Sequence, residues 1–347
     1  MVKSVQQLPT TFEAFAKSPA SDRWVATQYD ANGVNQVYTT KAGRTDFTCI
    51  TCTTRTGAPR VDRNKFMVNW HPSGQWLAVG VEEDSHDWMW LPQSWQRGLL
   101  QSGVWMNIWI TSPSGDRWYQ MTDFNKSNGP SDGFTGTAFT PDGRKAVWAE
   151  MVDGNTFLNA AGVWKLYMAD FDLGPDGVPS FVNKTDITPA GARWVEPGNF
   201  APDGRHILIS TDIGIADAEG QDQWSLDIGT GALQQLTHTA TVWDEHGLYS
   251  PSGKKISFIS SYPYRNEPDS YKTFSLKTEF MLMDANGGHL QQLTHFNVPG
   301  YPESQGRRTV AAVAWFIASS QLYAIVMGPE FIASSWVITF AGGCGAE

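Results

Sequence analysis

The sequence predicts an all-β fold, a six-bladed β-propeller in which every blade is a four-stranded antiparallel sheet. Three observations lead to this prediction: a turn motif that recurs along the chain, a second mark of Leu-Thr type after each turn, and an N-terminal segment that resembles the outer strand of a blade. Because propellers and solenoids are built from repeats of this kind, the periodicity is the primary signal for the fold class.

The turn motif consists of an aromatic residue, one further residue, proline, Asp or Ser, and glycine. Its four clear copies occupy residues 70–74, 139–143, 200–204 and 249–253. Each copy is followed by a run in which alternate residues tend to be apolar, as expected of a strand that leaves a tight turn. Residues 18–22 lack the glycine, and residues 315–319 have lost the proline as well. With these two weaker copies the chain contains six modules.

The second mark is an apolar residue followed by threonine, downstream of the turn. It occurs at Ile50-Thr51, Met121-Thr122, Ile187-Thr188, Leu236-Thr237 and Leu293-Thr294. Between turn and mark lie two short strands joined by a Gly-rich hairpin turn, as in residues 107–122. Each module therefore holds four antiparallel strands, and stacking the modules in a ring hides the faces of the sheets.

The ends of the chain complete the ring. The expected blades cover approximately residues 11–54, 64–123, 134–189, 194–238, 243–295 and 308–340. Residues 2–9 resemble the sequence "LQQLTH", which occurs at the expected outer strands of blades 4 and 5. The last module ends without such a strand. We therefore expect residues 5–8 to pair with residues 336–340, which makes residues 1–347 a single propeller domain.

Composition and charge limit the classes of function. A hydrophobic content of 41% is enough for a large core, and the formal net charge of −10 argues against nucleic acid as a partner. No signal peptide is visible at the start, and we expect a leader to be absent from this chain. Residues 309–328 carry no charge and are long enough to span a bilayer. Residues 313–326 nevertheless align with residues 68–81 in the phase of the repeat, which favours a sixth blade over a membrane helix.

The turn motif, the apolar strand, the "IW" or "LY" strand, the Gly turn and the Leu-Thr mark together resemble the TolB-like β-propeller repeat. The resemblance covers nearly the whole chain. It implies a fold found in the periplasmic protein TolB, in peptidase propellers, in oligogalacturonate lyases and in scaffold proteins. We expect neither the α/β domain that precedes the propeller of TolB nor the hydrolase domain of the peptidases. Because the repeat residues are structural, the resemblance implies little about activity.

Long connections between the second and third strands of the blades are the expected functional surface. They run at about residues 83–104, 151–162, 212–221 and 261–277, whereas the Pro-x-Gly turns at the other end are minimal. The first of them is rich in the aromatic and methionine side chains that are enriched in interfaces. The expected partner-binding residues are Trp88, Met89, Trp90, Trp95 and Trp105. The alternatives are that this loop hides its own tryptophans or that it binds a ligand such as a sugar.

No coherent acid–base, nucleophile or phosphate-binding motif accompanies these tryptophans. The sequence therefore favours a non-catalytic periplasmic or extracellular propeller without metal or cofactor. It would serve as a protein-binding scaffold or as an accessory subunit of an envelope or membrane complex. The alternative is a carbohydrate-active lyase or hydrolase with a site at the mouth of the channel, metal-dependent or not. Its candidate residues are His238, His246, His295, Asp244 and Glu245.

Cys49 and Cys52 lie at the end of the expected outer strand of the first blade. In an extended strand their Cα atoms would be about 10 Å apart, beyond disulfide reach, so a bridge requires the strand to end before Cys52. A disulfide, which would indicate an oxidising compartment, and a pair of free thiols both remain open. The third cysteine is Cys344.

Overall fold

The structure, a computed structural model, describes residues 2–84, 91–124, 132–153, 162–217, 219–239, 241–273, 275–328 and 332–341. It contains six four-stranded antiparallel sheets, which confirms the blades predicted from the repeat. The contacts divide the chain into two compact units, Phe12–Ile187 and Thr188–Glu347 together with Met1–Thr11. Each unit holds three blades and is described by itself.

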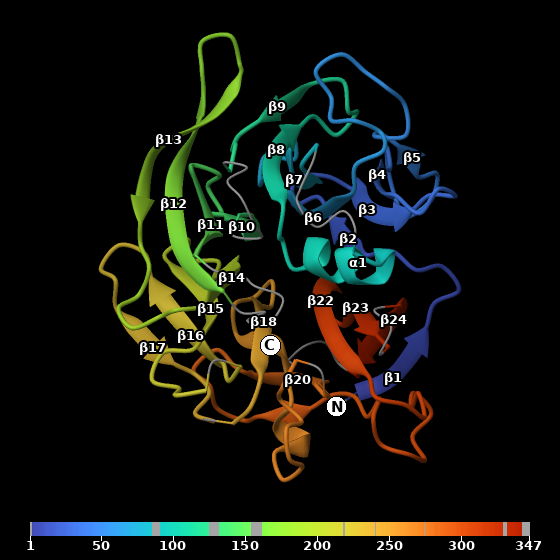
Figure 1. The fold of residues 1–347 in the computed structure, drawn as a ribbon, viewed down its shortest axis with the longest axis vertical. Coiled ribbons are helices and arrows are strands. Elements are labelled where there is room, and N and C mark those ends of the chain that lie inside the picture. The colour runs from blue at the N-terminus through green and yellow to red at the C-terminus, as the bar shows by residue number, and fades with distance from the viewer. Residues whose placement is uncertain are drawn as a thin grey trace. The chain divides into compact units, whose positions relative to one another are not determined.

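The unit Phe12–Ile187 contains the first three blades. Blade 1 consists of β2 (Ala14–Lys17), β3 (Trp24–Tyr29), β4 (Asn35–Thr39) and β5 (Thr48–Cys49). Blade 2 consists of β6 (Lys65–Trp70), β7 (Leu77–Glu82), β8 (Met106–Thr111) and β9 (Trp118–Gln120). Blade 3 consists of β10 (Phe134–Phe139), β11 (Lys145–Asp153), β12 (Val163–Leu173) and β13 (Pro179–Asp186). The strands β12 and β13 run on into a long hairpin, which is visible in Figure 1.

The second unit contains blades 4 to 6. Blade 4 consists of β14 (Val195–Phe200), β15 (His206–Thr211), β16 (Asp222–Asp227) and β17 (Leu233–Gln235). Blade 5 consists of β18 (Asp244–Tyr249), β19 (Lys255–Ser260), β20 (Glu279–Asp284) and β21 (Gln291–Gln292), with the 3-10 turn η1 (Tyr262–Tyr264) after β19. Blade 6 consists of β22 (Val310–Ala318), β23 (Gln321–Met327), β24 (Ala333–Phe340) and β1 (Val2–Gln7).

The last blade takes its outer strand from the N-terminus, as predicted. Val5 pairs with Ile338, and the N–H of Leu8 donates to the carbonyl oxygen of Ser335 at 2.8 Å. In Figure 1, blue β1 lies beside red β24. The uncharged stretch 309–328 forms β22 and β23, so the sixth blade and not the membrane helix is correct. Among the described residues, no helix combines the length and the apolar character needed to cross a bilayer.

The Pro-x-Gly turns join neighbouring blades as well as neighbouring strands. In the turn of blade 3, Gly143 has a φ of 72°, and its carbonyl oxygen lies 2.9 Å from Nε2 of His71 in the turn of blade 2. A Cβ on Gly143 would lie 2.6 Å from the His71 ring. Glycine is therefore required here for its backbone conformation and for the close approach of two turns.

The Leu-Thr marks fix the outer strand to the start of the third strand. In blade 5, Oγ1 of Thr294 accepts the N–H of Phe280 at 3.0 Å and donates to Oε2 of Glu279 at 2.7 Å. Leu293, the residue before it, donates its N–H to the carbonyl oxygen of Phe280 at 2.8 Å. The threonines of blades 1, 2 and 4 make the same pair of bonds, with Gln36, Asn107 and Asp222 in the place of Glu279. The repeated threonine thus hydrogen-bonds the outer strand to the third strand; it is buried in blades 1 and 5 and half-buried in blades 2 and 4.

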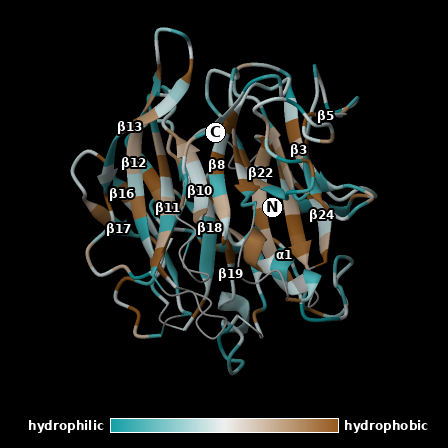
Figure 2. Ribbon diagram, turned by 45° about the horizontal axis from the view of Figure 1, so that its top comes forward, coloured by the Kyte–Doolittle hydropathy of each residue, from teal (hydrophilic) through white to brown (hydrophobic). Residues whose placement is uncertain are grey.

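The core of each unit is formed by the apolar faces of the strands. Figure 2 shows hydrophobic residues along the strands and mostly hydrophilic residues in the connections. Among the largest fully buried side chains are Trp105, Trp148, Phe134, Phe280 and Tyr323.

Candidate functional site

The tryptophan-rich connection of blade 2 forms a short helix, α1 (Gln93–Gln101), that is held against blade 1. We call residues 91–103 the α1 platform. The Arg97 guanidinium lies 4.3 Å from the centre of the Tyr29 ring, and Nε2 of Gln101 donates to Oε2 of Glu13 at 3.1 Å. Burial raises the pKa of Glu13 to about 7, although Arg97 and Gln101 act in the opposite direction. In Figure 1, α1 lies beside β6 and β2.

The C-terminal end of the α1 platform is fixed to blade 3 by two glycines. The N–H of Phe134 donates to the carbonyl oxygen of Gly103 at 3.1 Å, and Val104 forms a bridge with Gly133. A Cβ on Gly103 would lie 1.8 Å from the carbonyl oxygen of Phe134, and one on Gly133 would lie 2.1 Å from that of Gly103. Only residues without a side chain permit this approach, so the platform is anchored to blade 3 as well as to blade 1.

The predicted partner-binding residues have different locations. Trp95 lies on α1 with 40% of its surface exposed, whereas Trp105 is buried at 1% exposure. Trp88, Met89 and Trp90 lie outside the described residues. The described part of the loop thus buries one tryptophan in the blade and presents another at the surface.

The candidate histidine His246 lies within the inner strand of blade 5, β18, as its third residue. Five of the six inner strands change register near their third residue. Those third residues are Met67, Gly136, Pro197, His246 and Ala312. His246 has a φ of 54°, and Met67 has a φ of 53° at the equivalent position. A β-bulge, which re-aims a side chain, is therefore part of the repeat itself.

This bulge brings His246 between two carboxylates. Its Nε2 lies 3.3 Å from Oε2 of Glu196 on β14, and its Nδ1 lies 3.6 Å from Oε2 of Glu245. Nδ1 is also 2.5 Å from the carbonyl oxygen of Ala312 on β22. Burial lowers the pKa of His246, but Glu245 and Glu196 outweigh it and hold that pKa above its usual range. Trp243 donates its indole N–H to Oε2 of Glu245 at 2.9 Å.

Glu196 was missed in the sequence, although the repeat contained the signal for it. Glu196 precedes Phe200 by four residues, and Glu245 precedes the equivalent Tyr249 by the same number. The two glutamates therefore occupy the same position in neighbouring inner strands. Aligning the repeats for charged residues, in addition to turns, would have found the pair.

The other three candidate residues of the enzyme alternative do not join this cluster. Asp244 is buried beside Thr239, and burial raises its pKa to about 7. His238 is exposed. The ring of His295 stacks on that of Tyr301 with 3.8 Å between the ring centres. Within the described residues, only His246 and Glu245 of the five candidates therefore contribute to a common site with Glu196.

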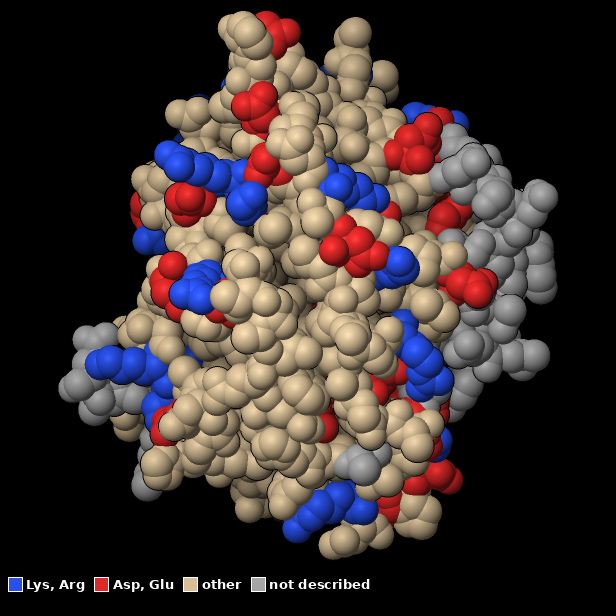
Figure 3. All heavy atoms as spheres, turned by 90° about the vertical axis from the view of Figure 1, so that its left-hand side faces the viewer, with Lys and Arg blue, Asp and Glu red and all other residues tan. Residues whose placement is uncertain are grey.

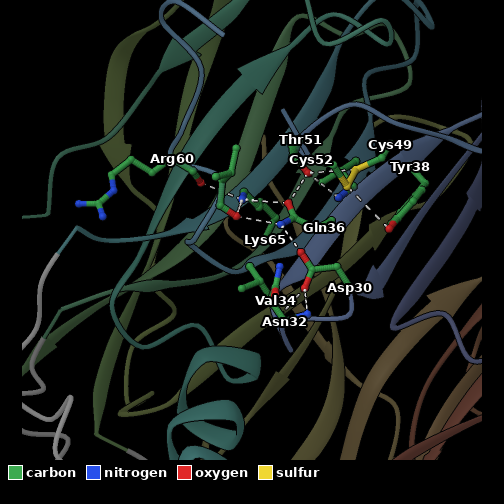
Figure 4. Close-up of a disulfide and its surroundings, with 12 residues drawn as sticks. Asp30, Asn32, Val34, Gln36, Tyr38, Cys49, Thr51, Cys52, Arg60 and Lys65 are labelled. Atoms are coloured by element: carbon green, nitrogen blue, oxygen red, sulfur yellow. Dashed lines mark hydrogen bonds between the residues drawn. A yellow bond between two sulfur atoms is a disulfide. The ribbon is translucent and has the colours of Figure 1, made fainter. Parts of the chain in front are cut away.

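Cys49 and Cys52 form a disulfide, with their Cα atoms 5.7 Å apart. The bridge is possible because β5 ends at Cys49, as the reach of an extended strand required. Figure 4 shows its surroundings: Thr51, between the two cysteines, donates to Oε1 of Gln36 at 2.7 Å. Lys65 donates to the same oxygen at 3.1 Å, and burial lowers the pKa of Lys65 to about 8. Cys344 lies outside the described residues.

A polar pocket of about 190 Å³ lies in the unit Phe12–Ile187. It is lined by Arg60, Arg63, Glu82 and Asp84 among others, and Arg63 and Glu82 approach one another to 3.8 Å. Ligand pockets usually have volumes of about 300–1,000 Å³, so this pocket is small for an organic ligand.

On the face drawn in Figure 3, basic side chains lie among acidic ones and form no separate basic patch.

Comparison with known proteins defines the class of fold. The chain is similar to the structure of a putative TolB from Agrobacterium tumefaciens, with a TM-score of 0.54 and 17% identity over 97% of this chain and 92% of that one. No family model and no curated protein matches the sequence. At this level of identity the likeness concerns the fold alone. The chain has the TolB-like six-bladed β-propeller fold.

Two further similarities are to parts of larger proteins. A structure reported in an analysis of two prolyl endopeptidases has a TM-score of 0.51 and 8% identity, over 99% of this chain and 42% of that one. A puromycin hydrolase S511A mutant has a TM-score of 0.51 and 13% identity, over 96% of this chain and 45% of that one. This chain therefore matches less than half the length of these two proteins.

Proposed function

We propose that this propeller is a protein-binding scaffold or accessory subunit whose contact surface includes the α1 platform. The observation that carries the proposal is the exposure of Trp95, 40%, on a helix that is anchored to blades 1 and 3. A rigid aromatic side chain supplies a large contact area at a low cost in conformational entropy. Val152, exposed near the end of β11 in blade 3, offers a further apolar side chain in the same unit.

The proposal includes a location and a kind of partner. A disulfide in a chain with few cysteines supports an oxidising compartment such as the periplasm or the cell exterior. The charge of −10 supports a protein partner, for example an envelope or membrane complex, over nucleic acid. We further propose that the six blades act as a single domain.

Site-specific photo-crosslinking tests the contact surface. A photoreactive amino acid at position 95, introduced into the full chain in its source cells, is expected to give a discrete adduct of higher mass. Leu290 offers a matched control, because it is 45% exposed and lies in the β20–β21 turn, at the opposite end of a blade. Adducts from neither position, or equally from both, would contradict the proposed surface.

The second candidate function is a carbohydrate-active lyase or hydrolase. It is favoured by one observation, the approach of Glu196, Glu245 and His246, which places two carboxylates around an imidazole. Such a set can supply general acid–base groups. Incubation of the purified chain with acidic and neutral oligosaccharides, followed by product analysis, tests this candidate, and a Glu245→Gln variant should abolish any turnover.

A further inference from the structure

We propose that Glu196, Glu245 and His246 form a binding site for one divalent transition-metal ion. The inference is independent of the proposed binding function, because it uses no residue of the α1 platform. The metal would be bound by the inner strands of the second unit whether its role there is structural or catalytic.

The backbone of two neighbouring strands positions the ligands. Glu245 and His246 are consecutive residues of β18, and Glu196 occupies the equivalent position of Glu245 on the neighbouring strand β14. In a regular strand, consecutive side chains point to opposite faces. The bulge at His246 breaks this alternation and allows both side chains of β18 to approach Glu196.

The hydrogen bonds around the cluster have the pattern of an outer shell of a metal site. Metal-bound histidines almost always donate their other ring N–H to a carbonyl or carboxylate, which fixes the tautomer and the orientation of the ring. Here the carbonyl oxygen of Ala312 lies 2.5 Å from Nδ1 of His246, leaving Nε2 toward Glu196. Glu245 is held in turn by the indole N–H of Trp243. Both ligand side chains of β18 are therefore oriented by neighbours that would not bind the metal.

The separations fit a small ion. One ligand atom from each of the three residues lies within 4.8 Å of the other two. Bonds of about 2.1 Å in tetrahedral geometry place ligand atoms about 3.4 Å apart. The 3.3 Å between Nε2 of His246 and Oε2 of Glu196 matches this spacing, and a carboxylate oxygen of Glu245 lies within 4.8 Å of both ligand atoms.

The donor atoms select the class of metal. Imidazole favours zinc and its transition-metal neighbours over magnesium and calcium, while the two carboxylates also suit manganese. Three protein ligands leave at least one position for water or for a bound group. The expected ion is therefore Zn²⁺ or Mn²⁺, and Mg²⁺ is the ion that the site should bind least well.

Calorimetric titration of the chelator-treated full chain tests the site. We expect one equivalent of Zn²⁺ or Mn²⁺ to bind, and Glu196→Gln and His246→Asn each to weaken that binding by at least roughly tenfold, since even outer-shell changes cost about 10- to 100-fold. Asn is chosen because it tolerates the positive φ of 54° at position 246. Melting curves of the metal-free variants separate loss of binding from loss of the fold.

Matched controls are available in two exposed histidine–carboxylate pairs. His206 lies 2.6 Å from Asp203 and His289 lies 2.5 Å from Asp284, each measured from Nδ1 to Oδ2. His206→Gln and His289→Gln should leave the titration unchanged. Nitrogen NMR of the His246 ring distinguishes the two states of the cluster, because metal binding leaves one ring N–H and an imidazolium has two. Absence of stoichiometric binding, binding that resists both site variants, or an imidazolium that persists with added Zn²⁺ and Mn²⁺ would overturn the proposal.

Discussion

Glu13 links the ionisation of one residue to the attachment of α1. Burial raises its pKa from 4.5 to about 7, so the folded state holds the proton that the unfolded state releases between these values. Its contribution is therefore most favourable below about pH 4.5 and is lost as the pH rises toward 7. A Glu13→Gln variant should become progressively more stable than the parent chain over this interval, by up to about 3 kcal/mol.

Urea unfolding of both proteins at several pH values measures this difference. The comparison of variant with parent removes the contributions of all other titrating groups. A stability difference that stayed constant between pH 4.5 and 7 would contradict the raised pKa of Glu13.

Single residues also show where sequence reasoning reached its limit. The threonine of each Leu-Thr mark was recognised as a repeat, but its role as a clamp on the third strand depends on a partner in another strand. The sequence showed that a disulfide between Cys49 and Cys52 requires the strand to end before Cys52. In the structure β5 ends at Cys49, and the disulfide is formed. The position of His246 within β18 could not be anticipated, because a bulge depends on pairing between strands.

At the scale of single elements, α1 is the feature that the sequence did not predict. Its nine residues are short for an isolated helix, and no side chain caps its N-terminal end. The contacts with Tyr29 and Glu13 lie in blade 1, and the Gly103–Gly133 approach lies at the start of blade 3. The helix is therefore stabilised by tertiary contacts that residue propensities do not contain.

The anchoring of α1 predicts a specific effect of substitution at Gly103. Gly103→Ala should destabilise the protein by about 2 kcal/mol or more, because the new Cβ meets the Phe134 carbonyl and the φ of 92° is unfavourable for alanine. Thermal unfolding measures the loss, and hydrogen exchange should show faster exchange in residues 91–103.

Gly177→Ala is the matched control for this substitution. Gly177 also has a positive φ, 74°, but a Cβ there would have no neighbour within 4 Å. It should therefore show the backbone strain alone, about 1 kcal/mol. Equal effects at the two positions would mean that the backbone approach at Gly103 does not matter.

At the scale of the whole molecule, the repeat predicted most of the architecture. The six blades, their antiparallel strands and the N-terminal strand of the last blade follow from turns and marks that recur along the chain. Site residues were less predictable, because a repeat constrains the positions that all blades share. Glu196 and Glu245 occupy equivalent positions of two neighbouring inner strands, so an alignment of the repeats that included charged residues would have found this pair.

The pairing of β1 with β24 is the claim on which the closed repeat depends, and hydrogen–deuterium exchange of the native chain tests it most directly. Leu8 donates its N–H to Ser335, and Val2 to Gln7 are paired along Trp336 to Phe340. The account predicts slow exchange for those amides of residues 2–8 that point toward β24, such as the amide of Leu8, because they are hydrogen-bonded to that strand. Exchange of residues 2–8 at the rate of an unfolded peptide, with β24 still protected, would contradict it.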